Sequence, residues 1–522
     1  MKKLRNASFI VLMVLMVIIA GCSNGDNAST ANGSKGSKGT ENSDKDLTIA
    51  VSADVASFDV HNHQATQTQA IHVNMFDSLI EKNRDGEFVP DLADSWKNID
   101  ELTWEFTLNP KAKFHNGDPV TSNDVKFSLE RAATDTSLLE NKYFKQIKEV
   151  KVIDDHTFQV ITNGPDPVLL NRVSRQGSGI LPAKYIEENG WEHFLKNPVG
   201  AGPYKFVEWK KDDRIVLEKF AEYHKYDPKW EKVVFRIIPE DSTRVAELLT
   251  GGVDMAVNIP PSDWERVKNN EGTQMVSGPT HRIMQLVLRL TDGNATTDPR
   301  VREAIDLAID KQLIIDTIYG GAGTPTRTGV TPYSFGGNED LYGKSLFDPE
   351  KAKKLLKEAG YEKGLDLTLS VSNGRYLKDK ESAELIQAML AEVGVNVTLE
   401  PLEWSKFLEN VSGKTFKEVY MVGFANSLGD ASNPLGQVHP AITAGETDYK
   451  NPEVEKLLDE AMYNMNEEAR AEQYKQVQEI VAEERPRVYL YTLDQFLGMS
   501  DKLTYETHID EWYVVDDVEV VK

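Results

Sequence analysis

The chain has 522 residues and a formal net charge of −24 at pH 7. This length allows two or three domains, each with its own core, and 40% hydrophobic with 27% charged residues is typical of a soluble globular body. The acidic balance opposes contact with nucleic acid and with anionic membrane surfaces, so neither is predicted as a partner. Cys22 is the single cysteine, which excludes an intrachain disulfide.

Residues 1–21 have the organisation of a secretory signal peptide. A basic start leads into an apolar run, 9–20, whose twelve residues are fewer than the ~20 that a membrane-spanning helix needs. Ile19-Ala20-Gly21-Cys22 resembles a lipobox, so Cys22 is predicted to carry diacylglycerol and to become the mature N-terminus. An ordinary signal peptide with an incidental cysteine is the alternative. Residues 22–46 are polar and are predicted to form a disordered tether.

The stretch 89–131 combines several local signals in a fixed order. Its segment 103–108, TWEFTL, alternates polar and large apolar residues, which predicts a strand with one buried face. Asn116-Gly117 supplies a turn, and Thr121 with Asp124 forms a capping box before a helix. Further along, the glycines and prolines of 197–206, NPVGAGPYKF, force a tight turn before a strand. A phosphate-binding loop is rejected there, because G-K-[ST] is absent.

The second half of the chain repeats strand and helix signals. Asp298-Pro299 and Asp348-Pro349 each place an N-cap before a proline at the first helical position. A strand at 366–371, a helix and a strand at 395–399 predict a mostly parallel sheet with a right-handed crossover. The strand-like run 284–290 is interpreted as a crossing to a second lobe.

Both the 89–131 stretch and the motif Asn-Pro-Val-Gly-Ala-Gly-Pro-Tyr resemble the family 5 extracellular solute-binding proteins of ABC importers, which bind peptides, nickel chelates, haem or glutathione. The resemblance implies an α/β fold of the two-lobed periplasmic-binding-protein type II (cluster C), with an extra subdomain in the first lobe. It implies a first lobe at 47–283 with the subdomain at about 81–203. A second lobe at 284–490 and a C-terminal return at 491–522 complete the predicted organisation.

The resemblance also implies where a ligand lies, between two closing lobes. Asp430 matches an aspartate that pairs with a ligand's α-amino group, and its loop, with Asn426 and Ser427, has a Ser-x-Gly-acid pattern closer to glutathione-binding relatives. Arg375 falls near a carboxylate-clamping arginine, a task that suits a guanidinium. Phe424 is a candidate apolar wall. The alternatives are a solvated turn aspartate, a surface salt bridge and a core aromatic, respectively.

The predicted function is capture of a short peptide or peptide-like solute, a di- or oligopeptide or glutathione, by a monomeric lipoprotein on the extracytoplasmic face of the cell membrane. Its partner would be the permease subunits of an ABC importer. No cofactor is expected. A nickel or other metal chelate is the alternative ligand, with His439 as a candidate contact; His61, His63 and His72 invite a metal interpretation but lack completing ligands. A secreted hydrolase is disfavoured, because neither G-x-S-x-G nor H-E-x-x-H occurs.

Overall fold

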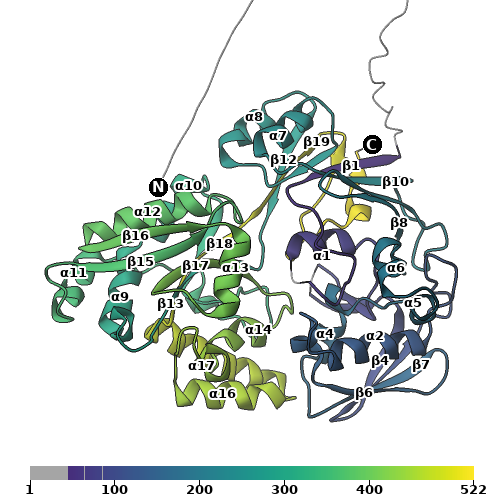
Figure 1. The fold of residues 1–522 in the computed structure, drawn as a ribbon, viewed down its shortest axis with the longest axis horizontal. Coiled ribbons are helices and arrows are strands. Elements are labelled where there is room, and N and C mark those ends of the chain that lie inside the picture. The colour runs from purple at the N-terminus through teal and green to yellow at the C-terminus, as the bar shows by residue number, and fades with distance from the viewer. Residues whose placement is uncertain (1–44, 64, 85, 522) are drawn as a thin grey trace, which may run out of the picture. The chain divides into compact units, whose positions relative to one another are not determined.

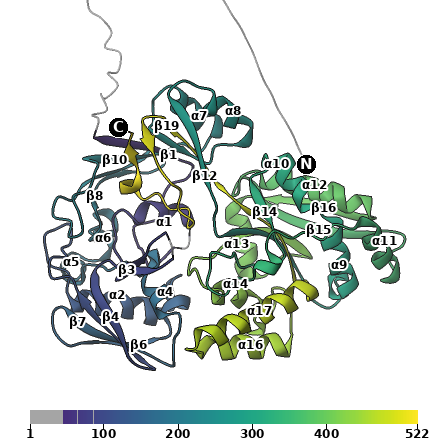
Figure 2. The ribbon, with the colours of Figure 1, turned by 180° about the vertical axis from the view of Figure 1, so that it is seen from behind.

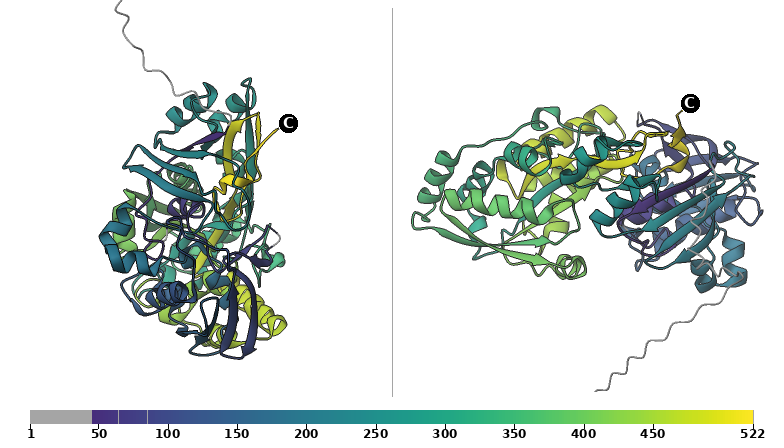
Figure 3. Two further views of the ribbon diagram at one scale, coloured as in Figure 1. Left: turned by 90° about the vertical axis from the view of Figure 1, so that its right-hand side faces the viewer. Right: turned by 90° about the horizontal axis from the view of Figure 1, so that it is seen from above.

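The computed structural model describes residues 45–63, 65–84 and 86–521. The predicted signal peptide, the lipidation site Cys22 and nearly all of the predicted tether lie outside these described residues. Three sheets of four or more strands organise the described part. Figures 1, 2 and 3 show how the strands and helices are arranged. Each of the three sheets has its own buried apolar cluster. We call the part around the seven-stranded sheet the first lobe and the part around the six-stranded sheet the second lobe.

The first-lobe sheet mixes parallel and antiparallel pairs. Strand β1 runs parallel to both of its neighbours, and the remaining pairs are antiparallel. In spatial order the strands are β12 (Thr273–Gly278), β19 (Gln495–Ser500), β11 (Met255–Val257), β1 (Asp46–Val51), β10 (Lys232–Ile237), β9 (Arg214–Lys219) and β8 (Tyr204–Lys210). Both strands beside β1 thus come from a part of the sequence that is far from β1 itself.

A four-stranded antiparallel sheet forms a separate layer, packed on helix α2 (Ser122–Thr134) (Figure 1). Its strands, in spatial order, are β4 (Ala93–Asp100), β5 (Thr103–Leu108), β7 (Thr157–Thr162) and β6 (Ile147–Val152). Strand β5 has the predicted bounds, and the predicted capping box is formed, with the Thr121 N–H and hydroxyl both donating to Asp124 at 2.9 and 2.7 Å. Two short ribbons complete the strands, β2 (Ile80–Lys82) with β3 (Phe88–Pro90) and β20 (Leu503–Thr504) with β21 (Glu519–Val520).

The second-lobe sheet is mixed, so the expectation of a mostly parallel sheet is wrong. In spatial order its strands are β14 (Gly323–Pro325), β18 (Arg487–Leu493), β13 (Arg282–Leu288), β17 (Val419–Ala425), β15 (Leu365–Ser372) and β16 (Val395–Leu402). Strands β15, β16 and β17 are parallel as expected from the strand–helix–strand order, whereas β13, β14 and β18 join antiparallel. The reason is that β13 brings the chain into this lobe and its neighbour β18 takes the chain out.

Helices cover the sheets of both lobes (Figures 1 and 2). The first lobe and its four-stranded layer carry α1 (Thr66–His72), α2, α3 (Asn141–Phe144), α4 (Leu169–Val173), α5 (Ala183–Asn189), α6 (Trp191–Lys196), α7 (Asp241–Leu249) and α8 (Trp264–Lys268). The second lobe carries α9 (Pro299–Ala308), α10 (Lys311–Ile318), α11 (Pro349–Glu358), α12 (Asp379–Glu392), α13 (Trp404–Gly413), α14 (Ser432–Leu435), α15 (Pro440–Thr443), α16 (Pro452–Tyr463) and α17 (Glu467–Glu484). The predicted Asp-Pro starts of α9 and α11 are confirmed, since Asp298 and Asp348 accept from Arg300 N and Lys351 N.

The chain crosses between the lobes twice. Residues 279–281 connect β12 to β13, and Asp494 connects β18 to β19. The strand at 282–288 therefore belongs to the second lobe, and the crossing lies just before it. After β19 the C-terminal segment runs along the first lobe (Figure 1). There Trp230 Nε1 donates to Val515 O at 3.0 Å and Tyr204 Oη donates to Asp516 at 2.6 Å.

The glycine motif at 197–206 holds the first lobe and its four-stranded layer together. Gly202 N donates to Met75 O at 2.9 Å, and a Cβ at Gly202 would lie 2.7 Å from the Met75 carbonyl carbon, so a side chain is excluded. His115 binds the same turn twice. Its Nε2 donates to Gly202 O at 3.0 Å, while its Nδ1 accepts from Gly200 N at 3.2 Å. Only a neutral imidazole can make both bonds.

Acid should therefore weaken the fold through His115. Burial lowers the pKa of His115 from 6.5 to about 4. Between pH 6.5 and about pH 4, the unfolded chain therefore binds a proton at this histidine and the folded chain does not. The stability from His115 is complete above pH 6.5 and is lost as pH falls toward 4, by up to about 3 kcal/mol at 1.36 kcal/mol per pKa unit. Urea unfolding across this range should show a shallower pH dependence for His115→Gln. His193→Gln, at an exposed position of α6, is the control. Identical slopes for wild type and both variants would contradict the assignment.

Candidate ligand-binding site

Charged side chains gather where the two lobes meet, beside the two crossings. His281 N, in the first crossing, donates to Ile509 O at 3.1 Å, which holds the C-terminal segment 509–511 against the start of β13. There the Arg282 guanidinium donates to Glu511 at 2.8 Å and to Thr66 Oγ1 at 3.0 Å. Arg282 is only 7% exposed, so this ion pair joins the second-lobe strand to two segments of the first lobe in a largely dry environment.

The loop after β17 contains three of the predicted site residues. Asn426 is buried and uses its amide internally, donating to Ser334 Oγ at 3.0 Å and to Asp430 O at 3.1 Å. Asp430 is 1% exposed, and its carboxylate accepts from Arg470 at 2.8 Å and from Ser432 N at 2.9 Å. The Asp430 carboxylate thus already has a cationic partner within the second lobe, and it is closed to solvent.

Arg470 in turn depends on Asp430. Its guanidinium carbon lies 4.0 Å from the centre of the Phe335 ring, and its Nε has no hydrogen-bond partner among the described residues. Both members of the ion pair are therefore out of water, with side chains 4% and 1% exposed. Such a pair fixes the geometry of the loop at Asn426–Asp430, because removing either member would leave the other buried without compensation.

The same loop touches the first lobe through its backbone. Leu428 O accepts from Asn171 Nδ2 at 2.8 Å and from Lys82 Nζ at 3.1 Å, two donors that come from the first lobe. Ser427 Oγ accepts from Arg175 at 3.1 Å, while Arg175 also forms a buried ion pair with Glu140. Gly429, with φ +62°, lets the Lys82 ammonium approach closely, because a Cβ at this position would lie 2.7 Å from Lys82 Nζ. One short loop of the second lobe is thus held by three side chains of the first.

Two charged groups in this region have no ion-pair partner among the described residues. The Arg375 guanidinium is partly buried and lies between aromatic rings, 4.9 Å from the Tyr376 centre and 5.2 Å from the Trp404 centre. Burial, followed by the nearby positive charge of Arg282, lowers the pKa of Arg375. Asp510, adjacent to Glu511, is also partly buried, and its carboxylate lies within electrostatic range of Lys82, Arg175 and His281.

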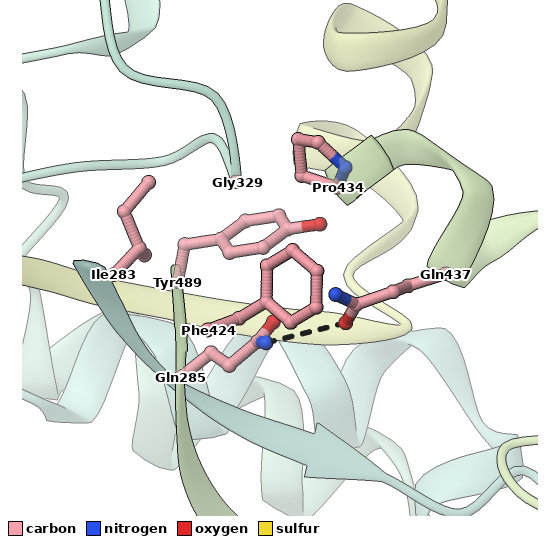
Figure 4. A pocket seen from close by; sticks show the side chains of 7 residues that line it. All are labelled: Ile283, Gln285, Gly329, Phe424, Pro434, Gln437 and Tyr489. Atoms are coloured by element: carbon pink, nitrogen blue, oxygen red, sulfur yellow. Dashed lines mark hydrogen bonds between the residues drawn. The ribbon is translucent and has the colours of Figure 1, made fainter. Parts of the chain in front are cut away.

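Sequence reasoning found only part of this arrangement. It proposed Arg375, Asn426, Ser427 and Asp430 individually, but it missed Asp510 and the Arg282–Glu511 pair. Asp510-Glu511 stands in an otherwise largely apolar segment, HIDEWYVV, and that is the single signal the sequence carries. Phe424, the predicted apolar wall, lies beside Ile283 of the neighbouring strand. It lines a narrow pocket within the second lobe together with Gln285, Gln437 and Tyr489 (Figure 4).

The histidines considered for metal binding lie in other surroundings. His61 Nε2 donates to Gly179 O at 3.0 Å and His63 contacts His72 at 3.1 Å; burial lowers the pKa of His61 and of His63 to about 4. Among the described residues, two groups of side chains lie close enough together to hold a metal ion, and none of these three histidines belongs to either. The groups are Asp77 with Asp91 and His224, and His439 with Glu455 and Asp459.

Two α/β lobes joined by neighbouring crossings, with charged groups meeting beside those crossings, define the class of two-lobed solute-binding proteins of periplasmic-binding-protein type II. The chain belongs to the family described as bacterial extracellular solute-binding proteins, family 5, which its residues 87–446 match. The predicted family and fold class are thereby confirmed. The protein is a substrate-binding component of ABC import that acts outside the cytoplasm, and it is not an enzyme.

Individual relatives cover nearly the whole chain. The glutathione-binding protein GsiB of Pectobacterium atrosepticum is 29% identical over 472 residues, which cover 88% of this chain and 91% of the relative. Among solved structures, DppA of Helicobacter pylori in complex with the peptide STSA aligns with a TM-score of 0.78 at 27% identity, covering 91% of this chain and 98% of DppA. NikZ of Campylobacter jejuni, in complex with Ni(L-His), shares the fold at a TM-score of 0.78 and 23% identity, over 91% and 99% of the two chains. In the ranges 45–63, 65–84 and 86–521, no helix has the length and apolar run that crossing a membrane requires.

Proposed function

We propose that the protein captures a short peptide or peptide-like solute, a di- or oligopeptide or glutathione, between its lobes and delivers it to an ABC permease. One observation carries this proposal. Arg375 and Asp510, a guanidinium and a carboxylate with no ion-pair partner among the described residues, flank the Arg282–Glu511 pair at the junction of the lobes. A zwitterionic solute supplies the two missing partners, its carboxylate for Arg375 and its amino group for Asp510.

The relatives support the same chemistry. GsiB is named for glutathione, and the DppA structure contains a peptide, so both relatives bind solutes that carry carboxylate and amino groups. We retain Asp430, Asn426, Ser427 and Phe424 as proposed contributors. The ion pair with Arg470 favours a role for Asp430 in shaping the loop, and it makes Asp510 the stronger candidate for direct contact with the ligand amine.

The proposal is tested by calorimetry and thermal shift on the mature body, with reduced glutathione, the dipeptide Met-Leu, the tetrapeptide Ser-Thr-Ser-Ala and nickel with histidine as probes. Stabilisation by at least one of the first three, with the probe recovered intact, is the expected result. Stabilisation by nickel–histidine alone would replace the peptide proposal with the metal-chelate alternative. No response to any probe would overturn both.

Closure of the lobes should depend on the Leu428 carbonyl. In Asn171→Ala the Leu428 oxygen loses one of its two donors from the first lobe. A typical net hydrogen bond of about 0.5–1.5 kcal/mol corresponds to a roughly two- to twelve-fold weaker affinity for the responding probe. Small-angle scattering of the probe-bound protein should show a larger radius of gyration than wild type. Asn189→Ala is the control, since the one side-chain hydrogen bond of Asn189 among the described residues goes to Tyr185 O in its own helix. Equal affinities for both variants and wild type would contradict a role in closure.

We also propose that the mature protein is attached to the membrane through a diacylglycerol on Cys22. The lipobox-like Ile19-Ala20-Gly21-Cys22 supports this proposal. Intact-mass measurement on native membranes should give a chain that starts at a lipidated Cys22. An unmodified Cys22 would refute it.

A further inference from the structure

Three side chains of types that bind metal ions meet in the first lobe, on segments that are far apart in the sequence. Asp77 lies between α1 and β2, Asp91 directly follows β3, and His224 lies in the connection from β9 to β10. One ring nitrogen of His224 and one carboxylate oxygen each of Asp77 and Asp91 lie within 4.8 Å of one another. Asp77 and Asp91 are 5% and 6% exposed, so the cluster is largely closed to water.

Backbone groups orient two of these side chains. His224 Nε2 lies 3.0 Å from Asp91 O, which can only accept, so Nε2 carries the proton and Nδ1 keeps its lone pair. A hydrogen bond from one ring nitrogen to a carbonyl is the usual support of a histidine that binds metal through the other nitrogen. The Asp91 carboxylate is held by Ser78 N, which donates to its Oδ2 at 2.9 Å.

Two buried atoms of the cluster have no hydrogen-bond partner among the described residues. They are Asp77 Oδ2 and His224 Nδ1, and each can offer a lone pair. The Lys225 ammonium binds neither of them, since it donates to Glu81 at 2.8 Å and to Asp91 Oδ1 at 3.3 Å. Buried polar atoms are normally paired, so two unpaired atoms in one cluster indicate a group that binds between them.

The charge of the cluster favours a cation as that group. Burial, followed by the negative charge of Asp91, raises the pKa of Asp77 well above its usual range, and Lys225 opposes this shift without removing it. A divalent ion would supply the missing positive charge and would take the place of a proton on Asp77. A water molecule is the competing occupant. It could donate to both lone pairs, but it would bring no charge.

The mixed set of ligand atoms selects the kind of cation. Mg²⁺ and Ca²⁺ take oxygen ligands, whereas imidazole suits zinc and the neighbouring transition metals. Zinc bonds of about 2.0–2.2 Å place tetrahedral ligand atoms roughly 3.4 Å apart, so small rotations of the three side chains would complete the site. The half-exposed Glu81 side chain, which shares Lys225 with Asp91, gives this side of the cluster access to solvent.

We infer that Asp77, Asp91 and His224 form a binding site for a divalent transition-metal ion, with zinc as the best match. The bound ion would cross-link the base of the β2–β3 ribbon to the connection between β9 and β10. These segments are more than 130 residues apart in the sequence, as the bond from His224 to Asp91 O shows. The site should therefore stabilise the first lobe.

The inference does not depend on the proposed peptide-binding function. Glu81 and Lys82 are consecutive residues of β2, so their side chains point to opposite faces of the strand. Lys82 reaches Leu428 O in the second lobe, whereas Glu81 lies on the side of the acidic cluster. The cluster is thus separate from the proposed ligand contacts.

The test titrates the chelator-treated mature body with ZnCl2, without any peptide, by calorimetry and thermal unfolding. One zinc ion per chain should bind and raise the unfolding temperature, whereas MgCl2 and CaCl2 at the same concentration should not. Asp77→Asn keeps the size of the side chain, and His224→Gln keeps a donor for Asp91 O. Each should weaken zinc binding at least ten-fold, since losing only the partner behind a metal ligand already costs about 10–100-fold. Unfolding without zinc checks that both variants are folded.

His439→Gln is the matched control, because His439, Glu455 and Asp459 form the other described group that could hold a metal ion. This variant should bind zinc like wild type. No zinc binding, or binding that Asp77→Asn and His224→Gln leave unchanged, would overturn the site and leave water as the occupant. The glutathione, Met-Leu and Ser-Thr-Ser-Ala probes are measured separately, so a failure of the proposed function would leave the zinc result standing.

Discussion

Replacing Arg375 with methionine should weaken binding of the responding peptide or glutathione probe about a hundred-fold and should leave the unliganded protein at least as stable as wild type. Affinity falls because the desolvated carboxylate of the probe loses its cationic partner, a loss of about 2–5 kcal/mol. Stability does not fall, because the Arg375 guanidinium makes no described hydrogen bond and is repelled by Arg282. Calorimetry measures the affinity, and thermal unfolding without probe measures the stability.

A matched control separates the site from general effects of charge. Arg300→Met also removes one positive charge, but from an exposed side chain that pairs with Asp298 at the start of α9. This variant should bind the probe like wild type. If Arg375→Met and Arg300→Met have equal affinities, Arg375 has no part in the site. A fall in both stability and affinity in Arg375→Met would instead indicate a structural side chain.

The second large effect concerns Asp430. Asp430→Ala should destabilise the second lobe by about 3–5 kcal/mol, because Arg470 would be left buried without its partner. Urea unfolding followed by intrinsic fluorescence measures this change. Affinity for the probe should fall as well, by ten-fold or more, since the loop Asn426–Asp430 would lose the contact that fixes it.

A double variant distinguishes the two possible roles of Asp430. Asp430→Leu combined with Arg470→Met replaces the ion pair by apolar side chains of similar size, and it should recover most of the stability. If affinity recovers with it, Asp430 acts by shaping the loop. If stability recovers while affinity stays ten-fold or more below wild type, Asp430 contacts the ligand amine, as the family resemblance implies. An Asp430→Ala protein of wild-type stability would refute the structural role.

Local interactions explain why the sequence predicted many elements well. The Thr121–Asp124 capping box, the Asp-Pro starts at 298 and 348 and the alternating strand at 103–108 are all set by residues within a few positions of one another. Their hydrogen bonds and apolar periodicity can be read from neighbouring letters. The motifs at 89–131 and 197–204 likewise carried the family, because they are contiguous.

Pairing between distant segments cannot be predicted from neighbouring residues in this way. The antiparallel entry of β13 beside β18 joins segments about 200 residues apart, and the sequence-based expectation of a mostly parallel second sheet was therefore wrong. The partners of charged groups follow the same rule. The residues next to Asp430 in the sequence do not indicate that Arg470 pairs with it. Those next to Arg375 do not indicate that its guanidinium lacks an ion-pair partner in the part of the chain that the structure describes.

By itself, then, the sequence determined the family, the two-lobed class and the loop in which a ligand contact was expected. Only the tertiary structure decided which charges in that region are already neutralised and which are not. The physical reason is that the availability of a side chain for a ligand depends on its burial and on its nearest opposite charge. Both are set by segments brought together through folding, such as 82, 171 and 428 or 375, 282 and 511.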